Sequence, residues 1–363
     1  MKRSALVLAC GLAAAGSLAP QPAQAAANVS VSSPSCGALR MTNGTSAPVD
    51  VETDGGAWAE LQPRQSITRT GLRGGEYVWM AYGVSDSLLK AKGYTNVASC
   101  KGVAPRPLDG DQNNDRKADV LGIQANTGNL YYYKMTATGL APGVKAGTGW
   151  NSMLWMQQVN EVEGAATPNV LLAVRKDGAV FQYANLGAGR FGSAKQVGKG
   201  LVGYSNFTVL PLNNPIFPGM RMLLASKGDV LQGFVMADGM VDTEHPMNLA
   251  TGWSTATKTI AVRNFDNDRL CDIISIRTDG SMQLHRINTD FTKNDFLMPP
   301  VKIGSSWGAM GIVTSPGSLN GDHLSDLVSR RNDGNLYKYV NQGSRWGTAE
   351  KIGANWNGIR LLA

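Results

Sequence analysis

The sequence predicts an all-β protein, and three observations carry this prediction. Short apolar runs alternate with polar residues, 43 glycines and 16 prolines punctuate them, and helix signals are nearly absent. One sequence pattern also recurs five times: a short apolar run, two or three polar residues, a glycine and a run of alternating apolar and polar residues that is typical of a strand. The five glycines lie about 50 residues apart, at Gly128, Gly178, Gly228, Gly280 and Gly334.

A period of this length with strand-like content is typical of one propeller blade per repeat. Residues 102–363 are therefore predicted to form a five-bladed β-propeller. The last residues, Ile359–Ala363, match by position the strand that opens a repeat. We expect this strand to join the first blade, because closure of the ring removes exposed sheet edges. Seven blades would require two from the N-terminal segment, which is too short and too unlike the repeats.

The first 25 residues are predicted to be a signal peptide. A positively charged start precedes the apolar stretch Ala5–Leu18, and a small-x-small cleavage site ends at Ala25. The alternative is a lipoprotein cleavage box at Cys10. Too few apolar residues precede Cys10 for such a box, and the apolar stretch continues well beyond this residue. No other stretch reaches the roughly 18 apolar residues of a membrane span. The protein is therefore expected to be secreted.

The charge balance argues against a nucleic-acid partner. The 34 Lys and Arg residues stand against 27 Asp and Glu residues, which gives a formal net charge of +7. This is mild for the length, and no basic run stands out. Phosphate binding needs basic residues concentrated on one face.

Residues 26–101 do not carry the repeat and are predicted to form a separate small β-sandwich. Alternating runs are separated there by turns such as Asn43-Gly44. Cys36 and Cys100 bracket the segment and are expected to form a disulfide. Cys271 is expected to be a small buried hydrophobe rather than a reactive thiol. Such a module is expected to dock to a partner or to cap its neighbour.

Three repeats begin with an oxygen-rich loop that predicts calcium. Oxygen-bearing side chains at positions 1, 3, 5 and 9, with a backbone carbonyl from position 7, can wrap a hard cation. The alternative is a polar turn in which Asp and Asn bond their own backbone. Repeats two and three lack the later acids, and no metal is predicted there. The predicted ligand sets are Asp111, Asn113, Asp115, Lys117 and Asp119; Asn264, Asp266, Asp268, Leu270 and Asp272; and Ser318, Asn320, Asp322, Leu324 and Asp326.

Tryptophans near the ends of the repeats are the predicted ligand-binding residues. A flat ring can stack on a pyranose while nearby amides bind its hydroxyls. The alternative is that each tryptophan fills the space between neighbouring blades. The second repeat has lost its tryptophan, and the strand aromatics Tyr133, Tyr183, His285 and Tyr339 are expected to pack. The four tryptophans are Trp150, Trp253, Trp307 and Trp356.

The loop motif, followed by Asp119-Val-Leu and then by Gly128-Asn-Leu-Tyr-Tyr-Tyr133, resembles the FG-GAP/VCBS-type calcium-binding propeller repeat of secreted actinobacterial proteins and integrin α-subunits. The resemblance covers residues 102–363, with decayed second and third repeats. In architecture the chain also resembles tachylectin-type five-bladed lectins and the propeller lectin subunit of Streptomyces umbrella toxin particles. These resemblances imply recognition of sugars or other proteins, with calcium for loop integrity.

An enzyme is not expected. The three histidines, His245, His285 and His323, lie in different repeats, and no nucleophile elbow, His-Glu-x-x-His pair or phosphate-cradling loop is present. Carboxylate pairs could in principle hydrolyse glycosides, but the clearest ones already belong to the metal loops.

Two functional hypotheses therefore stay open. The first is a secreted, calcium-stabilised lectin, whose weak repeated sites for a cell-surface glycan gain strength by multivalency. The second is a protein-docking subunit of a secreted assembly such as an antibacterial toxin particle, with no sugar binding of its own.

Overall fold

The predicted all-β class is confirmed. The computed structural model describes residues 29–53, 58–73, 75–85, 89–98, 100–101, 109–160, 169–210, 221–263, 265–266, 270–288, 295–322 and 324–363. The predicted signal peptide with Cys10 lies outside this part of the chain. The described residues contain no α-helix, and no helix among them is long and apolar enough to cross a membrane. Four single-turn 3-10 helices occur: η1 (Trp150–Ser152), η2 (Trp253–Thr255), η3 (Trp307–Ala309) and η4 (Trp356–Gly358).

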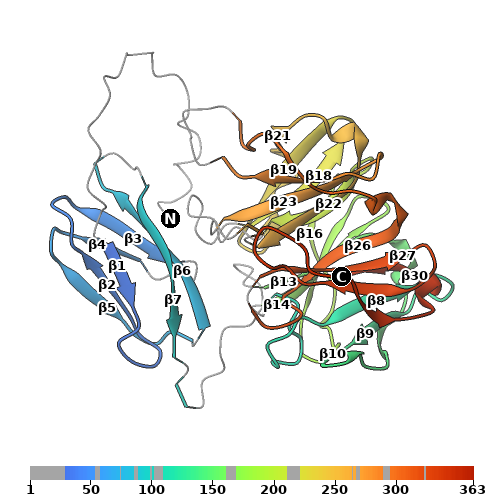
Figure 1. The fold of residues 1–363 in the computed structure, drawn as a ribbon, viewed down its shortest axis with the longest axis horizontal. Helices are drawn as coiled ribbons and strands as arrows, with labels where there is room; N and C mark the ends of the chain where they lie inside the picture. The colour runs from blue at the N-terminus through green and yellow to red at the C-terminus, as the bar shows by residue number, and fades with distance from the viewer. Residues whose placement is uncertain are drawn as a thin grey trace.

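Two antiparallel sheets form the N-terminal part (Figure 1). Alternation along their strands turns apolar side chains inward, and Met41, Val51, Leu61 and Trp79 share one buried core. One sheet has the order β1 (Val29–Ser32), β2 (Leu39–Asn43), β5 (Ser66–Arg69). The other has the order β4 (Trp58–Leu61), β3 (Val49–Thr53), β6 (Gly75–Gly83), β7 (Leu89–Val97).

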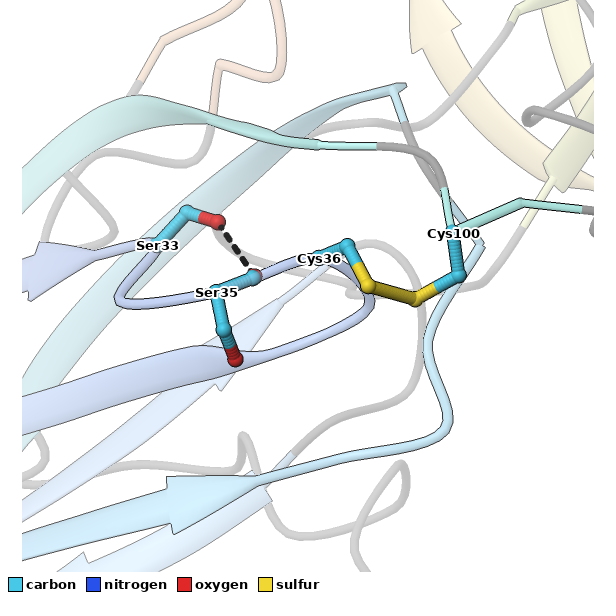
Figure 2. Close-up of a disulfide and its surroundings, with 4 residues drawn as sticks. All are labelled: Ser33, Ser35, Cys36 and Cys100. Atoms are coloured by element: carbon cyan, nitrogen blue, oxygen red, sulfur yellow. Dashed lines mark hydrogen bonds between the residues drawn. A yellow bond between two sulfur atoms is a disulfide. The ribbon is translucent and has the colours of Figure 1, made fainter.

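The predicted disulfide between Cys36 and Cys100 is confirmed (Figure 2). It joins the loop after β1 to the chain after β7, with the two Cα atoms 5.0 Å apart. Beside it the Ser33 hydroxyl donates to the carbonyl oxygen of Ser35. The cross-link therefore ties the beginning of this part to its end. Cys271 is buried elsewhere and takes no part in a disulfide.

Five further sheets follow along the chain. The first contains β12 (Val144–Gly147), β9 (Leu130–Tyr133), β8 (Val120–Gln124) and β30 (Ile359–Leu362), and the short pair β10 (Met135–Thr136) and β11 (Gly139–Leu140) lies between β9 and β12 in the chain. The second contains β13 (Met153–Asn160), β14 (Asn169–Arg175), β15 (Val180–Ala184) and β16 (Lys195–Gly198). The third contains β17 (Ser205–Leu210), β18 (Arg221–Lys227), β19 (Val230–Ala237), β20 (Met240–Val241) and β21 (Met247–Ala250). The fourth contains β22 (Ala256–Arg263), β23 (Cys271–Arg277), β24 (Met282–Arg286) and β25 (Val301–Gly304). The fifth contains β26 (Met310–Gly317), β27 (Asp326–Arg331), β28 (Leu336–Tyr339) and β29 (Glu350–Gly353).

The expected role of the terminal strand is confirmed. β30 pairs antiparallel with β8, with Leu361 opposite Ile123 and Leu362 opposite Gly122. The leading strands β13, β17, β22, β26 and β30 also contact one another in that order, and β30 contacts β13 in turn. We call these five the inner strands. The C-terminal strand thus completes the sheet that the earliest strands of this part began.

The repeated glycine has a conformational reason. All five glycines have a positive φ, between 59° and 81°, at the turn that joins the second strand of a sheet to the third. Side-chain-bearing residues rarely adopt this region, so glycine is preferred there. The carbonyl oxygen of Gly280 then accepts the backbone N–H of Trp307 at 2.9 Å, and Gly334 and Trp356 repeat the contact at 2.8 Å. The glycine turn therefore fixes the tryptophan that follows it.

Five apolar clusters lie between neighbouring sheets, one at each boundary. The second strands of the sheets, such as β18 and β23, are buried along nearly their whole length because a sheet packs on each of their faces. A tryptophan stands in four of the clusters. The boundary between the second and third sheets holds Leu201 instead, whose N–H bonds the carbonyl of Gly178. Leucine thus replaces the lost tryptophan.

Candidate ligand-binding cavity

A cavity of about 350 Å³ lies among the five inner strands. Every inner strand contributes to it, and its lining follows a rule of position. The residues four and five places after each boundary tryptophan, or after Leu201, line the cavity in all five repeats. These pairs are Leu154 and Trp155, Ser205 and Asn206, Thr257 and Lys258, Gly311 and Ile312, and Arg360 and Leu361.

One sector of the cavity is apolar and aromatic. Trp155 and Phe207 lie 6.0 Å apart between ring centres, and both line the cavity. Tyr204, which precedes β17, also lines the cavity and donates its hydroxyl to the Gln232 side chain at 2.8 Å. Leu154 at the same sector is 42% exposed. Aromatic surface is therefore available on the β13 and β17 side.

Amide and hydroxyl side chains supply polar groups to the same lining. The amide oxygen of Gln157 accepts the N–H of Val209 at 2.9 Å, and the Asn206 amide donates to the carbonyl oxygen of Ala256 at 3.0 Å. These contacts tie neighbouring inner strands together. Thr314 also lines the cavity from β26. The cavity thus combines flat apolar rings with hydrogen-bonding groups.

The opposite sector is positively charged. Lys258 on β22 and Arg360 on β30 line the cavity, and Arg330 lies behind the glycine of the strand between them. A Cβ atom at Gly311 would come within 2.8 Å of Nη2 of Arg330. Burial lowers the pKa of Lys258, and the charge of Arg330 lowers it further. Burial lowers the pKa of Arg360 as well. The described lining contains no Asp or Glu.

Both arginines also bridge sheets through backbone carbonyls. Arg360 donates from Nη1 to the carbonyl oxygen of Met153 at 2.8 Å, and from Nη2 to that of Trp150. Arg330 donates to the carbonyl oxygen of Ile359. Their Nε atoms are buried and have no hydrogen-bond partner within the described chain. The carbonyl contacts hold the guanidinium groups but leave their charge uncompensated.

The four predicted ligand-binding tryptophans, Trp150, Trp253, Trp307 and Trp356, are packed between sheets. Their side chains are 2–8% exposed, as expected if each tryptophan fills the space between neighbouring sheets. Each ring packs at a tilt of 37–50° against the strand aromatic of the following sheet, at centre-to-centre distances of 4.5–5.0 Å. Sugar stacking by these rings stays a prediction, and the buried rings offer it no open face. The pairs are Trp356 with Tyr133, Trp150 with Tyr183, Trp253 with His285, and Trp307 with Tyr339.

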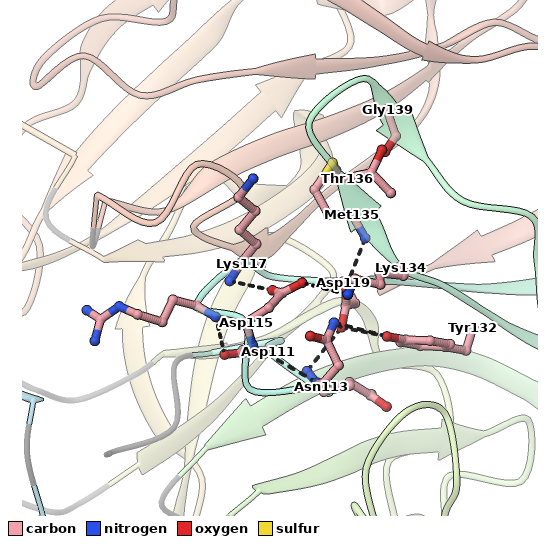
Figure 3. Close-up of polar contacts among 12 residues, drawn as sticks. Asp111, Asn113, Asp115, Lys117, Asp119, Tyr132, Lys134, Met135, Thr136 and Gly139 are labelled. Atoms are coloured by element: carbon pink, nitrogen blue, oxygen red, sulfur yellow. Dashed lines mark hydrogen bonds and ion pairs between the residues drawn. The ribbon is translucent and has the colours of Figure 1, made fainter. Parts of the chain in front are cut away.

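The first predicted calcium loop is closed by its own backbone (Figure 3). Asp111 accepts N–H groups of Asn113, Asp115 and Arg116 at 2.9–3.3 Å. Asp115 accepts the N–H of Lys117 and pairs with Lys134 at 3.2 Å. These contacts are those of the polar-turn alternative. The carboxylates of positions 1 and 5 nevertheless keep oxygen lone pairs that a hard cation uses.

In the fifth predicted calcium loop the side chains of positions 1, 3 and 5 hydrogen-bond one another. The hydroxyl of Ser318 lies 3.0 Å from the amide oxygen of Asn320 and 3.2 Å from a carboxylate oxygen of Asp322. Oγ of Ser318 also accepts the N–H groups of Gly321 and Asp322, and Asp322 accepts that of Leu324. These contacts too are those of a polar turn in which side chains bond the loop's own backbone. Groups of three or more His, Cys, Asp or Glu that could hold a metal do not occur among the described residues.

The acids at position nine of the loops, Asp119 and Asp326, accept backbone hydrogen bonds. Oδ2 of Asp326 accepts the N–H of Leu319 at 2.7 Å, and Oδ1 accepts that of Asn341 at 2.8 Å. Asp119 makes the same two contacts with Gln112 and Met135. Burial raises the pKa of Asp119 to about 6 and that of Asp326 to about 7, although the accepted hydrogen bonds lower both. Both carboxylates thus anchor their loops to the following strands.

The fourth loop is described only in part. Asp272 accepts the N–H of Phe265 at 2.8 Å, which repeats the anchoring contact of the position-nine acids. Asp266 forms an ion pair with Arg286. Leu270 is buried. Asn264 and Asp268 lie outside the described residues, so the geometry of this ligand set stays a prediction.

No family model matches the chain, and no curated protein matches it. Among solved structures it is similar to an Agrocybe aegerita lectin that recognises non-reducing terminal N-acetylglucosamine, with 12% identity, 87% of this chain and 92% of that chain covered, and a TM-score of 0.38. It is similar to the BP39L lectin of Burkholderia pseudomallei, with 13% identity, 90% and 99% covered, and a TM-score of 0.36. The third is AofleA of Arthrobotrys oligospora, with 9% identity, 90% and 87% covered, and a TM-score of 0.37. Likenesses this distant leave the chemistry of the cavity to be judged from its own residues.

Proposed function

We propose that the chain is a secreted five-bladed β-propeller that recognises carbohydrate in its central cavity, preceded by a disulfide-closed β-sandwich. The blades are the five four- to five-stranded sheets, and β30 closes the ring on β8. The role proposed is binding without catalysis. The disulfide Cys36–Cys100 supports secretion, because such bonds persist in oxidising compartments.

One observation carries the sugar proposal: aromatic and hydrogen-bonding side chains share one cavity. The partly exposed ring of Trp155 offers a flat apolar surface, and Asn206 and Thr314 offer polar groups in the same lining. A pyranose presents an apolar face and a ring of hydroxyls, so it matches such a surface. A volume of about 350 Å³ lies within the range of small-molecule sites.

Calcium belongs to the proposal as a loop stabiliser. The side chains of Ser318, Asn320 and Asp322 would hold the ion in the fifth loop, and those of Asp111 and Asp115 in the first. When bound, the ion would neutralise clustered carboxylates and fix the loop. Asp119 and Asp326 would hold the loop from behind through the N–H groups that they accept.

A glycan array tests the proposal. The mature protein is expected to give discrete hits, and Trp155→Ala and Thr314→Trp are expected to remove them, the first by deleting the stacking ring and the second by filling the cavity. Leu186→Ala is the matched control, because this side chain is 52% exposed and does not line the cavity.

Two outcomes would contradict the proposal. Hits that survive both cavity variants would place the sugar elsewhere on the protein. A blank array, together with a secreted protein that co-purifies from the native medium, would favour the docking-subunit hypothesis instead.

A further inference from the structure

The charge of the cavity is distributed unevenly, and this narrows the class of ligand. Lys258 and Arg360 stand on β22 and β30, with β26 between them. The strand between them carries Gly311, which has no side chain to separate the two cations. Arg330 adds a third positive charge directly behind that glycine.

These charges are not neutralised by the protein. No described Asp or Glu forms an ion pair with Lys258, Arg330 or Arg360. The cavity lining described here contains no carboxylate. Clefts lined by one sign of charge focus the field on a ligand of the opposite sign, and burial reduces the screening by salt.

The two arginines retain hydrogen-bonding capacity as well. A guanidinium group has five N–H donors, and the carbonyl contacts of Arg360 use only some of them. Its buried Nε, like that of Arg330, has no hydrogen-bond partner among the described residues. A carboxylate accepts such donors in the planar geometry that guanidinium groups present.

We infer that the ligand of this cavity is an acidic sugar, whose carboxylate lies against Lys258 and Arg360 while its ring stacks on the Trp155 side. The inference rests on the proposed function, because it names the class of sugar that the same cavity takes. The ring and the charge of such a ligand match the two opposite sectors of the lining.

Lys258 provides the sharpest test, because no hydrogen bond or ion pair holds its ammonium group in the described structure. Arg360 and Arg330, in contrast, tie sheets together, and their removal would also disturb the ring. Lys258→Gln is therefore expected to leave the fold intact. Lys195→Gln is the matched control, since Lys195 is exposed on the outer strand β16.

On an array with neutral, carboxylated and sulfated glycans, we expect the hits to be carboxylated. Lys258→Gln should weaken them about tenfold, as for loss of one charge-assisted contact. Lys195→Gln should not change them. Thr314→Glu, which adds a negative charge to the lining, should remove them even if Lys258→Gln fails to fold. Sulfated hits alone would overturn the carboxylate assignment.

A second measurement separates this inference from the proposed function. Thermal unfolding is followed in sodium acetate and in sodium chloride at equal ionic strength. Neutral hits that Lys258→Gln leaves unchanged would overturn the inference while the sugar-binding function stands. If no glycan binds but acetate raises the melting temperature, and Lys258→Gln abolishes this rise, the result would support an anion site at Lys258 and contradict the binding of a sugar. A blank array without such stabilisation would contradict both.

Discussion

The indole ring of Trp253 and the imidazole ring of His285 lie 4.7 Å apart, centre to centre, at the boundary between the third and fourth sheets. His285 is 3% exposed, and its Nε2 lies 2.8 Å from the hydroxyl of Ser275. A tyrosine fills the corresponding place at three other boundaries. The fourth sheet therefore has an imidazole where the first, second and fifth sheets have a phenol.

The protein is expected to lose stability on acidification because of His285. Burial lowers the pKa of this imidazole from 6.5 to about 4, so the folded state binds fewer protons than the unfolded state. The contribution is present above pH 6.5 and is lost as the pH falls towards 4. The loss reaches about 3 kcal/mol at most. Urea unfolding at a series of pH values measures it.

His285→Tyr is the matched variant, because Tyr339 occupies the corresponding place in the fifth sheet: it lies opposite Leu327, as His285 lies opposite Ile273. The acid-dependent loss should shrink in this variant. An unchanged pH profile would assign the acid sensitivity to other groups.

Truncation of a boundary tryptophan should destabilise the five-sheet part of the protein. Trp253→Ala is expected to cost about 3–5 kcal/mol, because it leaves a cavity between the third and fourth sheets. Trp253→Leu should cost less, since Leu201 fills the corresponding place at another boundary. Chemical denaturation measures both. A Trp253→Ala protein of unchanged stability that no longer binds glycan would restore the sugar-stacking role of this residue.

A side chain at Gly304 should displace the tryptophan beside it. A Cβ atom there would lie 2.7 Å from Nε1 of Trp307, so Gly304→Val overpacks the boundary. The expected cost is about 1–3 kcal/mol. Gly358→Ala is the control, because nothing lies within 4 Å of a Cβ atom at that position. Equal melting temperatures for the two variants would contradict the packing described here.

Two acids of the fifth loop should respond differently to calcium. Calcium is expected to raise the melting temperature, and a chelator should reverse the effect. Asp322→Ala should reduce this response. Asp326→Asn should cost about 1–3 kcal/mol with or without calcium, because an amide has one oxygen for the N–H groups of Leu319 and Asn341. A calcium response that depends only on Asp326 would reverse the two roles.

Removal of the disulfide should act on the N-terminal part alone. Cys36 and Cys100 are 64 residues apart, and a loop of this length corresponds to about 4 kcal/mol of denatured-state entropy. The double Cys→Ser variant should therefore unfold in two transitions, with that of the ring unchanged. Hydrogen exchange resolves the two parts. A shift of the ring transition would indicate that the two parts fold as one unit.

Local rules made much of the fold predictable. A glycine such as Gly280 or Gly334 predicts a turn with positive φ, and the leftover strand after the last repeat predicts the pairing of β30 with β8. The tryptophans were harder, because an aromatic ring that packs between blades and one that stacks on a sugar have the same sequence signature. Burial separates the two roles, and burial depends on the neighbouring sheet.

The cavity could not be predicted from the sequence. Its lining comes from five repeats, and the residues at equivalent places differ in chemistry, as Leu154, Gly311 and Arg360 do. Only ring closure brings them together. The acids at position nine of the loops show a related limit of sequence-based prediction. An aspartate such as Asp326 has the same sequence pattern around it whether it binds a cation or accepts two backbone N–H groups.

The pairing of β30 with β8 also constrains the order of assembly. The backbone groups of Leu121 bond those of Ala363 at 2.8 and 3.0 Å, across nearly the whole length of this part of the chain. While a newly made chain is incomplete, β8 has no partner on that side, and an unpaired strand edge is a template for another chain. Contacts so distant in sequence also form slowly. The protein is therefore most prone to self-association during biosynthesis, before β30 has been made. Shielding of the free edge of β8 would protect the nascent chain from this self-association.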